Sequence, residues 1–241
     1  MGKLISVYGP DGSGKTTLAY ALANELASGD TLVLLVHTDF SRPVLPERIP
    51  ELQDALSLGQ LLLTGDRYNM EDSFVPYPKN SNVFVTGILH NENFSSYPAS
   101  ACRPEAAKKY FETVSAVFDF VIVDSTDDVS DNLALAGLAQ AGAVVELVPP
   151  NIQGVLFSEA YGMIFDSLHT KEKTLYAAAK CRDDQNPELI EHRLGVRFSA
   201  RLPYSIEVDA KAMSGGLIRG CAGKEGISYE REILRLRGMV A

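Results

Sequence analysis

Cysteine and histidine are scarce in this sequence. The chain has 241 residues, of which 3 are cysteine and 4 are histidine. The cysteines, Cys102, Cys181 and Cys221, lie far apart and form no C-x-x-C pair. A disulfide-stapled domain needs several paired cysteines, and a zinc ribbon needs closely spaced ones. The pattern therefore favours neither class.

Long apolar runs are also missing. A membrane-spanning helix needs about 18 or more consecutive apolar residues, and no part of the chain supplies them. The first apolar run, Leu4–Tyr8, is interrupted by Gly9, Pro10 and Gly12 before the apolar core of a signal peptide is complete. We therefore expect a cytoplasmic protein.

Basic residues are outnumbered by acidic ones. The chain has 22 Lys and Arg residues against 31 Asp and Glu residues, which gives a net charge of -9. A protein that holds nucleic acid mainly by neutralising its phosphates shows the opposite balance. A general DNA coat is therefore disfavoured, and nucleic acid remains a secondary alternative as a partner.

Apolar residues, in contrast, are plentiful enough for a substantial core. The chain is 46% hydrophobic and 22% charged, a composition typical of folded globular domains. At about 150 residues per domain, the length fits one large domain or two small ones. No internal repeat, linker or domain boundary is visible, so we predict a single domain over residues 1–241.

Short apolar runs alternate with segments of helical periodicity, which is typical of βαβ units around a buried parallel sheet. The predicted strands are Leu4–Tyr8, Thr31–Val36, Asn82–Thr86, Phe120–Asp124, Ala143–Val148, Thr174–Ala179 and Phe198–Leu202. The predicted helices are Lys15–Leu26, Arg103–Val117, Asn132–Ala141, Gly154–Leu168, Pro187–Leu194 and Glu207–Met213. The expected fold is α/β, with one doubly wound, mostly parallel sheet and helices on both faces.

Residues 41–79 interrupt this alternation with several prolines. We predict a long irregular connection there, with one short helix at Ser57–Leu63. Long connections in compact domains often carry function. At the other end of the chain, Tyr229–Ala241 mixes arginine with apolar residues. A closing helix packed on the sheet is the favoured interpretation, and peripheral contact with a membrane is the alternative.

The strongest functional signal is a complete G-x-x-x-x-G-K-[ST] pattern between the first predicted strand and helix. It reads Gly9, Pro10, Asp11, Gly12, Ser13, Gly14, Lys15, Thr16, Thr17. In such a loop the backbone N–H groups and the helix N-terminus surround phosphate oxygens, the lysine reaches the β- and γ-phosphates, and the hydroxyl binds Mg²⁺. Lys15 and Thr16 are the candidates for these two roles. An ordinary glycine-rich turn is the alternative.

Two carboxylates are expected near this loop, because parallel strands deliver their carboxyl ends to one edge of the sheet. Asp124 ends a buried strand and is the candidate for binding Mg²⁺, with a solvated strand-end residue as the alternative. Asp39 follows the second strand and is the candidate for orienting an attacking water or holding a metal-bound water, with a turn residue as the alternative. Asp127 and Asp128 follow in a loop, where helix capping is favoured over a switch role.

Together, the loop, Asp39 and the strand that ends at Asp124 resemble the MinD/ParA group of P-loop ATPases. The resemblance covers essentially the whole chain, including Val148–Asn151, similar to the segment before the family's dimer-facing helix, and Leu202–Tyr204, similar to the segment near the base. It implies ATP and Mg²⁺ as ligands and an ATP-dependent homodimer. It also implies slow hydrolysis that times the placement of a cargo or of a membrane-bound partner.

Two positions and one segment depart from the family pattern. Pro10 stands where the family carries a lysine that reaches the partner subunit's nucleotide. His37 stands where an acid often precedes Asp39 by two residues. Ala177–Asp183 contains no asparagine to read adenine, and it also fails the N-K-x-D pattern of GTPases. ATP is therefore favoured on the resemblance alone.

Two branches of this group tolerate a loop without the early lysine. Bacterial tyrosine kinases are similar at Asp39–Pro43 and Ser57–Leu62, but they carry a C-terminal tyrosine cluster, and only Tyr229 follows Tyr204 here. ParA-like proteins of Tad-type pilus and secretion systems also relax the loop. The resemblance thus implies a weak ATPase that positions a secretion or pilus machine through an unidentified protein partner. A nucleotide-binding scaffold and a metabolic P-loop kinase or synthetase are the alternatives.

Overall fold

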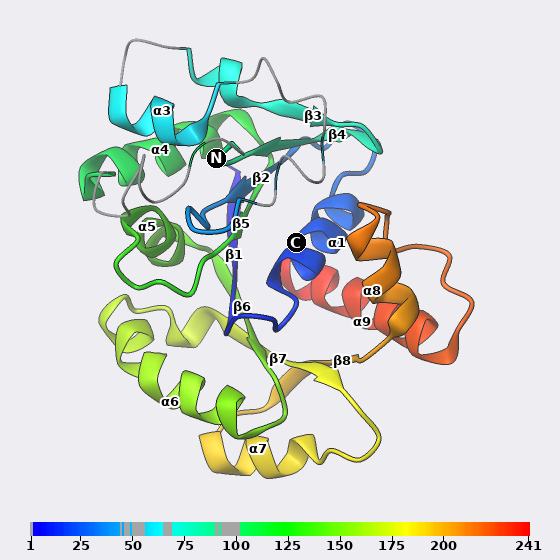
Figure 1. Ribbon diagram of the computed structural model, residues 1–241. Helices are drawn as coiled ribbons and strands as arrows, with labels where there is room; N and C mark the ends of the chain where they lie inside the picture. Colours follow the sequence, from blue (N-terminus) through cyan, green and yellow to red (C-terminus); the bar gives the residue numbers. More distant parts are fainter. Residues whose placement is uncertain are drawn as a thin grey trace.

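An eight-stranded sheet runs through the centre of the protein (Figure 1). The computed structural model describes residues 2–43, 45, 49, 56–64, 69–89, 92 and 102–241. The strand order is β3-β4-β2-β5-β1-β6-β7-β8, and all neighbours are parallel except β3 and β4. The strands are β1 (Lys3–Tyr8), β2 (Val33–His37), β3 (Val75–Tyr77), β4 (Asn80–Thr86), β5 (Phe120–Asp124), β6 (Ala143–Val148), β7 (Thr174–Cys181) and β8 (Phe198–Pro203). The predicted fold class is confirmed.

Helices cover both faces of this sheet. In Figure 1, α1 (Lys15–Leu26), α8 (Ile206–Met213) and α9 (Lys224–Val240) lie on one side. The opposite side carries α4 (Pro104–Val117), α5 (Asn132–Gln140) and α6 (Ile152–Ser167). Further helical elements are α3 (Leu58–Thr64), α7 (Pro187–Leu194), which packs beside α6, and the 3-10 turns η3 (Met70–Ser73) and η5 (Lys171–Lys173).

The strand sequences explain why the sheet is buried on both faces. In β1, Ile5 and Val7 join the core on the α1 side, whereas Leu4 and Tyr8 join the core on the α4 side. Successive side chains of a strand point to opposite faces, so a run of apolar residues fills both cores. The central strand β1 pairs with β5 on one side and with β6 on the other. The loop after β1 therefore emerges in the middle of the carboxyl edge.

One strand was not predicted. Residues 75–77 lie inside the segment 41–79 that we interpreted as an irregular connection, yet Val75–Tyr77 forms β3, antiparallel to β4. The strand has only three residues with a proline in the middle, so its pattern is too short to detect. Pro76 is tolerated because β3 is the edge strand. The short helix predicted at Ser57–Leu63 is present as α3, and the prolines at 46 and 50 lie outside the described residues.

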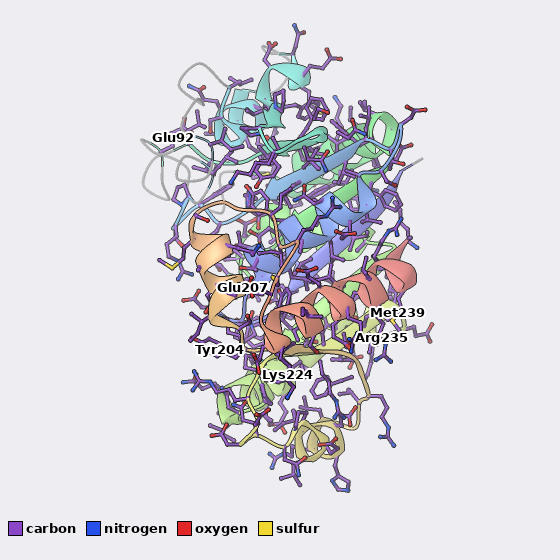
Figure 2. All side chains as sticks on the ribbon, turned by 90° about the vertical axis from the view of Figure 1, so that its right-hand side faces the viewer. Glu92, Tyr204, Glu207, Lys224, Arg235 and Met239 are labelled. Carbon is purple, nitrogen blue, oxygen red and sulfur yellow. The ribbon has the colours of Figure 1, made fainter. Side chains whose placement is uncertain are left out.

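The C-terminal helix packs inward, as the favoured interpretation predicted. It begins at Lys224, five residues before the predicted segment, and Tyr229, Ile233, Leu236 and Val240 form its buried face. This face lies against β8 and α1. Figure 2 looks onto α8 and α9, with Lys224 and Met239 near the two ends of α9. Among the described helices, none combines the length and the apolar character needed to cross a bilayer.

A buried carboxyl group in β6 makes stability depend on pH. Glu146 is 1% exposed, and the Ser158 hydroxyl of α6 donates a hydrogen bond to it. Burial raises the pKa of Glu146 from 4.5 to about 7. A raised pKa means that the folded state binds a proton more tightly than the unfolded state. The contribution of this bound proton to the free energy of unfolding is therefore fully present below pH 4.5 and is lost as the pH rises through about 7.

We expect Glu146→Gln to stabilise the protein at pH 8 by on the order of 3 kcal/mol, because glutamine keeps the acceptor for Ser158 without a charge. At pH 4.5 the variant should match the wild type. Burial also raises the pKa of Asp131 to about 7, so the variant keeps part of the pH dependence. Denaturant unfolding across this pH range measures the difference. The exposed Glu112→Gln is the matched control, and an unchanged pH profile in Glu146→Gln would contradict the assignment.

Candidate functional site

The loop between β1 and α1 has the backbone geometry of an anion site. Gly12 and Gly14 have φ of 70° and 96°, and Gly9 has φ of 151°. A Cβ at Gly9 would lie 2.6 Å from the backbone oxygen of Leu147, so this position requires glycine. Gly14 caps α1, and the first turn of that helix carries no acidic side chain. The positive end of α1 is therefore not neutralised by its own first turn and favours a bound anion.

Polar groups converge on the same loop. Lys15 Nζ donates to the carbonyl oxygens of Gly9 at 2.9 Å and Pro10 at 3.1 Å, which holds the ammonium group over the loop. Ser13 is 3% exposed, and its hydroxyl has no hydrogen-bond partner among the described residues. Buried hydroxyls nearly always have a partner, so this one fits a ligand oxygen.

Thr16 and Asp124 meet although 108 residues separate them. The Thr16 hydroxyl donates to Asp124 Oδ2 at 2.7 Å. Asp124 is 6% exposed, and the parallel pairing of β1 with β5 places it opposite Val7, just before the loop. The structure thus brings together the hydroxyl and the carboxylate that we expected to bind Mg²⁺.

His37 completes this cluster, and sequence reasoning missed its contact. His37 Nδ1 lies 2.9 Å from Asp124 Oδ2, and His37 Nε2 lies 3.1 Å from the hydroxyl of Tyr20 on α1. The last residue of β2 is opposite Asp124 in the sheet register. The only available signal was that His37 ends a strand next to the one that ends at Asp124. The contacts from Tyr20 to His37 and from His37 to Asp124 fix the orientation of the Asp124 carboxylate.

Asp39 forms a turn at the exit of β2. Its Oδ1 accepts hydrogen bonds from the backbone N–H groups of Ser41 at 2.9 Å and Arg42 at 3.0 Å, and from the Ser41 hydroxyl. The turn that we gave as the alternative is therefore present. Asp39 Oδ2 faces Arg42 Nε at 3.5 Å. Arg42 Nη1 in turn donates to Asp11 Oδ2 at 2.6 Å, which links the exit of β2 to the loop.

The predicted capping of α5 belongs to a different residue. Asp131, not Asp127 or Asp128, caps this helix by accepting a hydrogen bond from the Ala134 N–H. Asp128 instead accepts from the backbone and hydroxyl of Ser130. A cap lies immediately before the first helical turn, and Asp131 directly precedes Asn132, where α5 begins.

A small pocket adjoins the loop on the side of β7 and β8. It is lined by Ser13, Gly14, Thr17, Lys180, Leu202, Pro203, Tyr204, Ser205, Val208, Asp209 and Tyr229. Lys180 has φ of 54°, a conformation rare for lysine, and its Cε lies near Gly14. The guanidinium of Arg182 lies 4.7 Å from the ring centre of Tyr204, which Figure 2 labels after β8. The sequence contained no pattern that singled out Lys180.

The donor set fits a magnesium nucleotide. Mg²⁺ prefers oxygen ligands and is often held by one or two protein groups together with substrate phosphates and water. Thr16 and Asp124 supply such groups, and the described part of the chain has no cluster of three or more His, Cys, Asp or Glu side chains arranged for another metal. The unpartnered Ser13 hydroxyl and the unneutralised end of α1 suit the phosphates.

Several solved structures share this fold across nearly the full chain. The cell division ATPase MinD of Pyrococcus furiosus has a TM-score of 0.80 at 19% identity, covering 99% of this chain and 100% of that one. The septum site-determining protein MinD of Pyrococcus horikoshii, complexed with Mg-ADP, has a TM-score of 0.79 at 17% identity, covering 100% and 99%. A ParA family ATPase from Chlorobium tepidum has a TM-score of 0.76 at 14% identity, covering 98% of each chain.

At the sequence level no protein-family model matches the chain, and no curated protein does either. The structural neighbours described above are MinD and ParA ATPases. At these identities the likeness establishes the fold.

Proposed function

We propose that this chain is a cytoplasmic ATP-binding switch that hydrolyses ATP slowly and dimerises when ATP is bound. The observation that carries the proposal is the contact between Thr16 and Asp124 beside a loop whose glycines and lysine are arranged for phosphates. The shared fold supports it, since one neighbour is complexed with Mg-ADP. The proposed output is the positioning of a macromolecular cargo, with a secretion or pilus machine as the specific candidate.

Each residue of the site has a defined role in this proposal. Lys15 pairs with the β- and γ-phosphates, and Thr16 and Asp124 hold Mg²⁺. A bound Mg²⁺ would supply positive charge that offsets the negative charge of the phosphates. Asp39 orients the attacking water. Asp39 Oδ1 accepts the hydrogen bonds of the turn, whereas Oδ2 accepts none of them and lies 3.5 Å from Arg42 Nε, so Oδ2 is the atom that takes this role.

The proposed dimer uses the edge of the sheet that carries the loop. Helix α6 follows β6 at this edge, and its first turns leave Ile152 and Leu156 65% and 55% exposed. These residues are four apart and lie on one side of the helix. Exposed apolar side chains at the edge that carries the loop suit a face that is covered only when two subunits meet. The partner at this face is a second copy of the chain, and a further protein partner supplies the cargo.

We expect Asp39→Asn to slow phosphate release while leaving ATP affinity unchanged, because asparagine retains an acceptor for the turn but loses the charge that orients water. The loss is roughly a hundredfold in turnover, the usual contribution of a positioned acid or base. Light scattering in the apo, ADP and ATP states should show a dimer with ATP that persists in this variant.

Asp39→Ala is the matched comparison, because it removes the turn as well. If Asp39→Asn turns over ATP like the wild type and only Asp39→Ala is impaired, the turn is the whole role of Asp39. If the wild-type chain binds ATP but stays monomeric at tens of micromolar protein, the alternative of a nucleotide-binding scaffold is favoured. Turnover that requires an added phosphate acceptor would favour a metabolic kinase.

A further inference from the structure

Arg42 connects two segments that meet at the phosphate loop. Its Nη1 donates to Asp11 Oδ2 at 2.6 Å, and its Nε lies 3.5 Å from Asp39 Oδ2. Asp11 is the third residue of the loop, and Asp39 is in the turn that follows β2. The guanidinium therefore lies where the exit of β2 approaches the first half of the loop.

The charges around this guanidinium are negative. Asp11 and Asp39 contact it, and the nearby charges of Asp39, Asp11 and Asp127 add to the Asp11 hydrogen bond in raising the pKa of Arg42. The reciprocal hydrogen bond lowers the pKa of Asp11. Arg42 is thus a permanently charged group in an acidic corner of the site.

The pair is held loosely enough to exchange partners. The side chains of Arg42 and Asp11 are 56% and 64% exposed, and exposed ion pairs contribute little to stability. A terminal phosphate carries more charge than a carboxylate, and its oxygens match the planar fork of a guanidinium. Lys15, in contrast, is already directed into the loop by the carbonyl oxygens of Gly9 and Pro10.

We propose that Arg42 recognises the terminal phosphate of a nucleoside triphosphate, and that Asp11 holds the guanidinium beside the loop until that phosphate binds. The inference rests on the proposed function, because it requires a nucleotide in the loop. When Arg42 leaves Asp11 and binds the terminal phosphate, it connects the turn at Asp39 to that phosphate. This connection forms with a triphosphate and not with a diphosphate. The exit of β2 thereby reports whether the nucleotide has three phosphates or two.

The test compares two ligands by calorimetric titration, ADP and the non-hydrolysable analogue AMPPNP, each with Mg²⁺. Arg42→Ala is expected to weaken AMPPNP binding by roughly tenfold or more, because a hydrogen bond to a charged group is lost. ADP affinity should stay within about twofold. Arg42→Lys should recover only part of the loss, since an ammonium lacks the fork. Arg193→Ala, which removes an exposed arginine paired with Glu159 at 2.9 Å, is the matched control.

A second variant tests the holding role of Asp11. Asp11→Asn removes the competing carboxylate and should strengthen AMPPNP binding more than ADP binding. In the Arg42→Ala background this preference for AMPPNP should shrink, because a double-mutant cycle isolates the coupling of the two residues. If the effects of the two substitutions on AMPPNP affinity were simply additive, the proposal that Arg42 exchanges Asp11 for phosphate would be overturned.

The remaining outcomes separate this inference from the proposed function. If the wild type binds neither ligand, the nucleotide site itself is wrong and both proposals fail. If the wild type binds both and Arg42→Ala weakens both equally, Arg42 supports the loop without reading the phosphate. If Arg42→Ala lowers thermal stability but changes neither affinity, the contact with Asp11 is purely structural. The last two results overturn this inference and leave the nucleotide site intact.

Discussion

Lys15→Ala is expected to abolish nucleotide binding while the fold stays intact. The Lys15 ammonium contacts carbonyl oxygens of the loop, and we expect the fold to tolerate its removal because these contacts lie in the loop and not within either apolar core cluster. In the nucleotide complex it would form charged hydrogen bonds to phosphate oxygens. The loss of two such bonds lowers ATP affinity by roughly a hundredfold or more. Calorimetric titration with ATP and Mg²⁺ measures the change.

The control is another lysine replaced in the same way. Lys171 is 68% exposed and pairs with Asp166 at 3.4 Å, away from the loop. Lys171→Ala should bind ATP like the wild type, and both variants should unfold at the wild-type temperature. If Lys15→Ala kept wild-type affinity, the loop between β1 and α1 would not be the phosphate site.

Much of this site followed from the positions of residues along the chain. Apolar runs of strand length predicted β1 and β5, and the rule that parallel strands share a carboxyl edge then predicted that Thr16 and Asp124 would be close. Such predictions succeed where local pattern and global topology agree. The same rule placed Asp39 at this edge and offered a turn as one interpretation, and the turn is present.

The parts that were not predicted depend on tertiary contacts. His37 is the last residue of a buried strand, and its contact with Asp124 depends on the register between β2 and β5, which no local pattern specifies. The edge strand β3 exists because β4 offers it an open edge, although Pro76 weakens the local signal. The contact between Arg42 and Asp11 joins two loops 31 positions apart, and loop conformations carry no periodicity.

Asp124→Asn is the second variant for which we expect a large effect, and its readout is the dependence of nucleotide binding on Mg²⁺. Asp124 Oδ2 accepts a hydrogen bond from Thr16 and lies beside His37 Nδ1, so the carboxylate is held next to the loop, where the proposed function places Mg²⁺. Asparagine preserves the size of the side chain and removes its charge. The gain in ATP affinity on adding Mg²⁺ should therefore fall by about tenfold or more, since Mg²⁺ binds chiefly to charged oxygen ligands.

The matched control is Asp119→Asn, which lies directly before the other end of β5 and accepts a hydrogen bond from the Leu32 N–H. It should leave the Mg²⁺ dependence unchanged, because that end of the strand is remote from the carboxyl edge. Titrations with ATP in Mg²⁺ and in excess chelator, on both variants and the wild type, give the comparison.

Binding without metal should persist in Asp124→Asn, because Lys15 and the loop are unaltered. If that binding were lost as well, Asp124 would be needed to shape the loop rather than to hold the metal. If Asp124→Asn instead showed the same Mg²⁺ dependence as the wild type, the metal would be held by ligands other than Asp124.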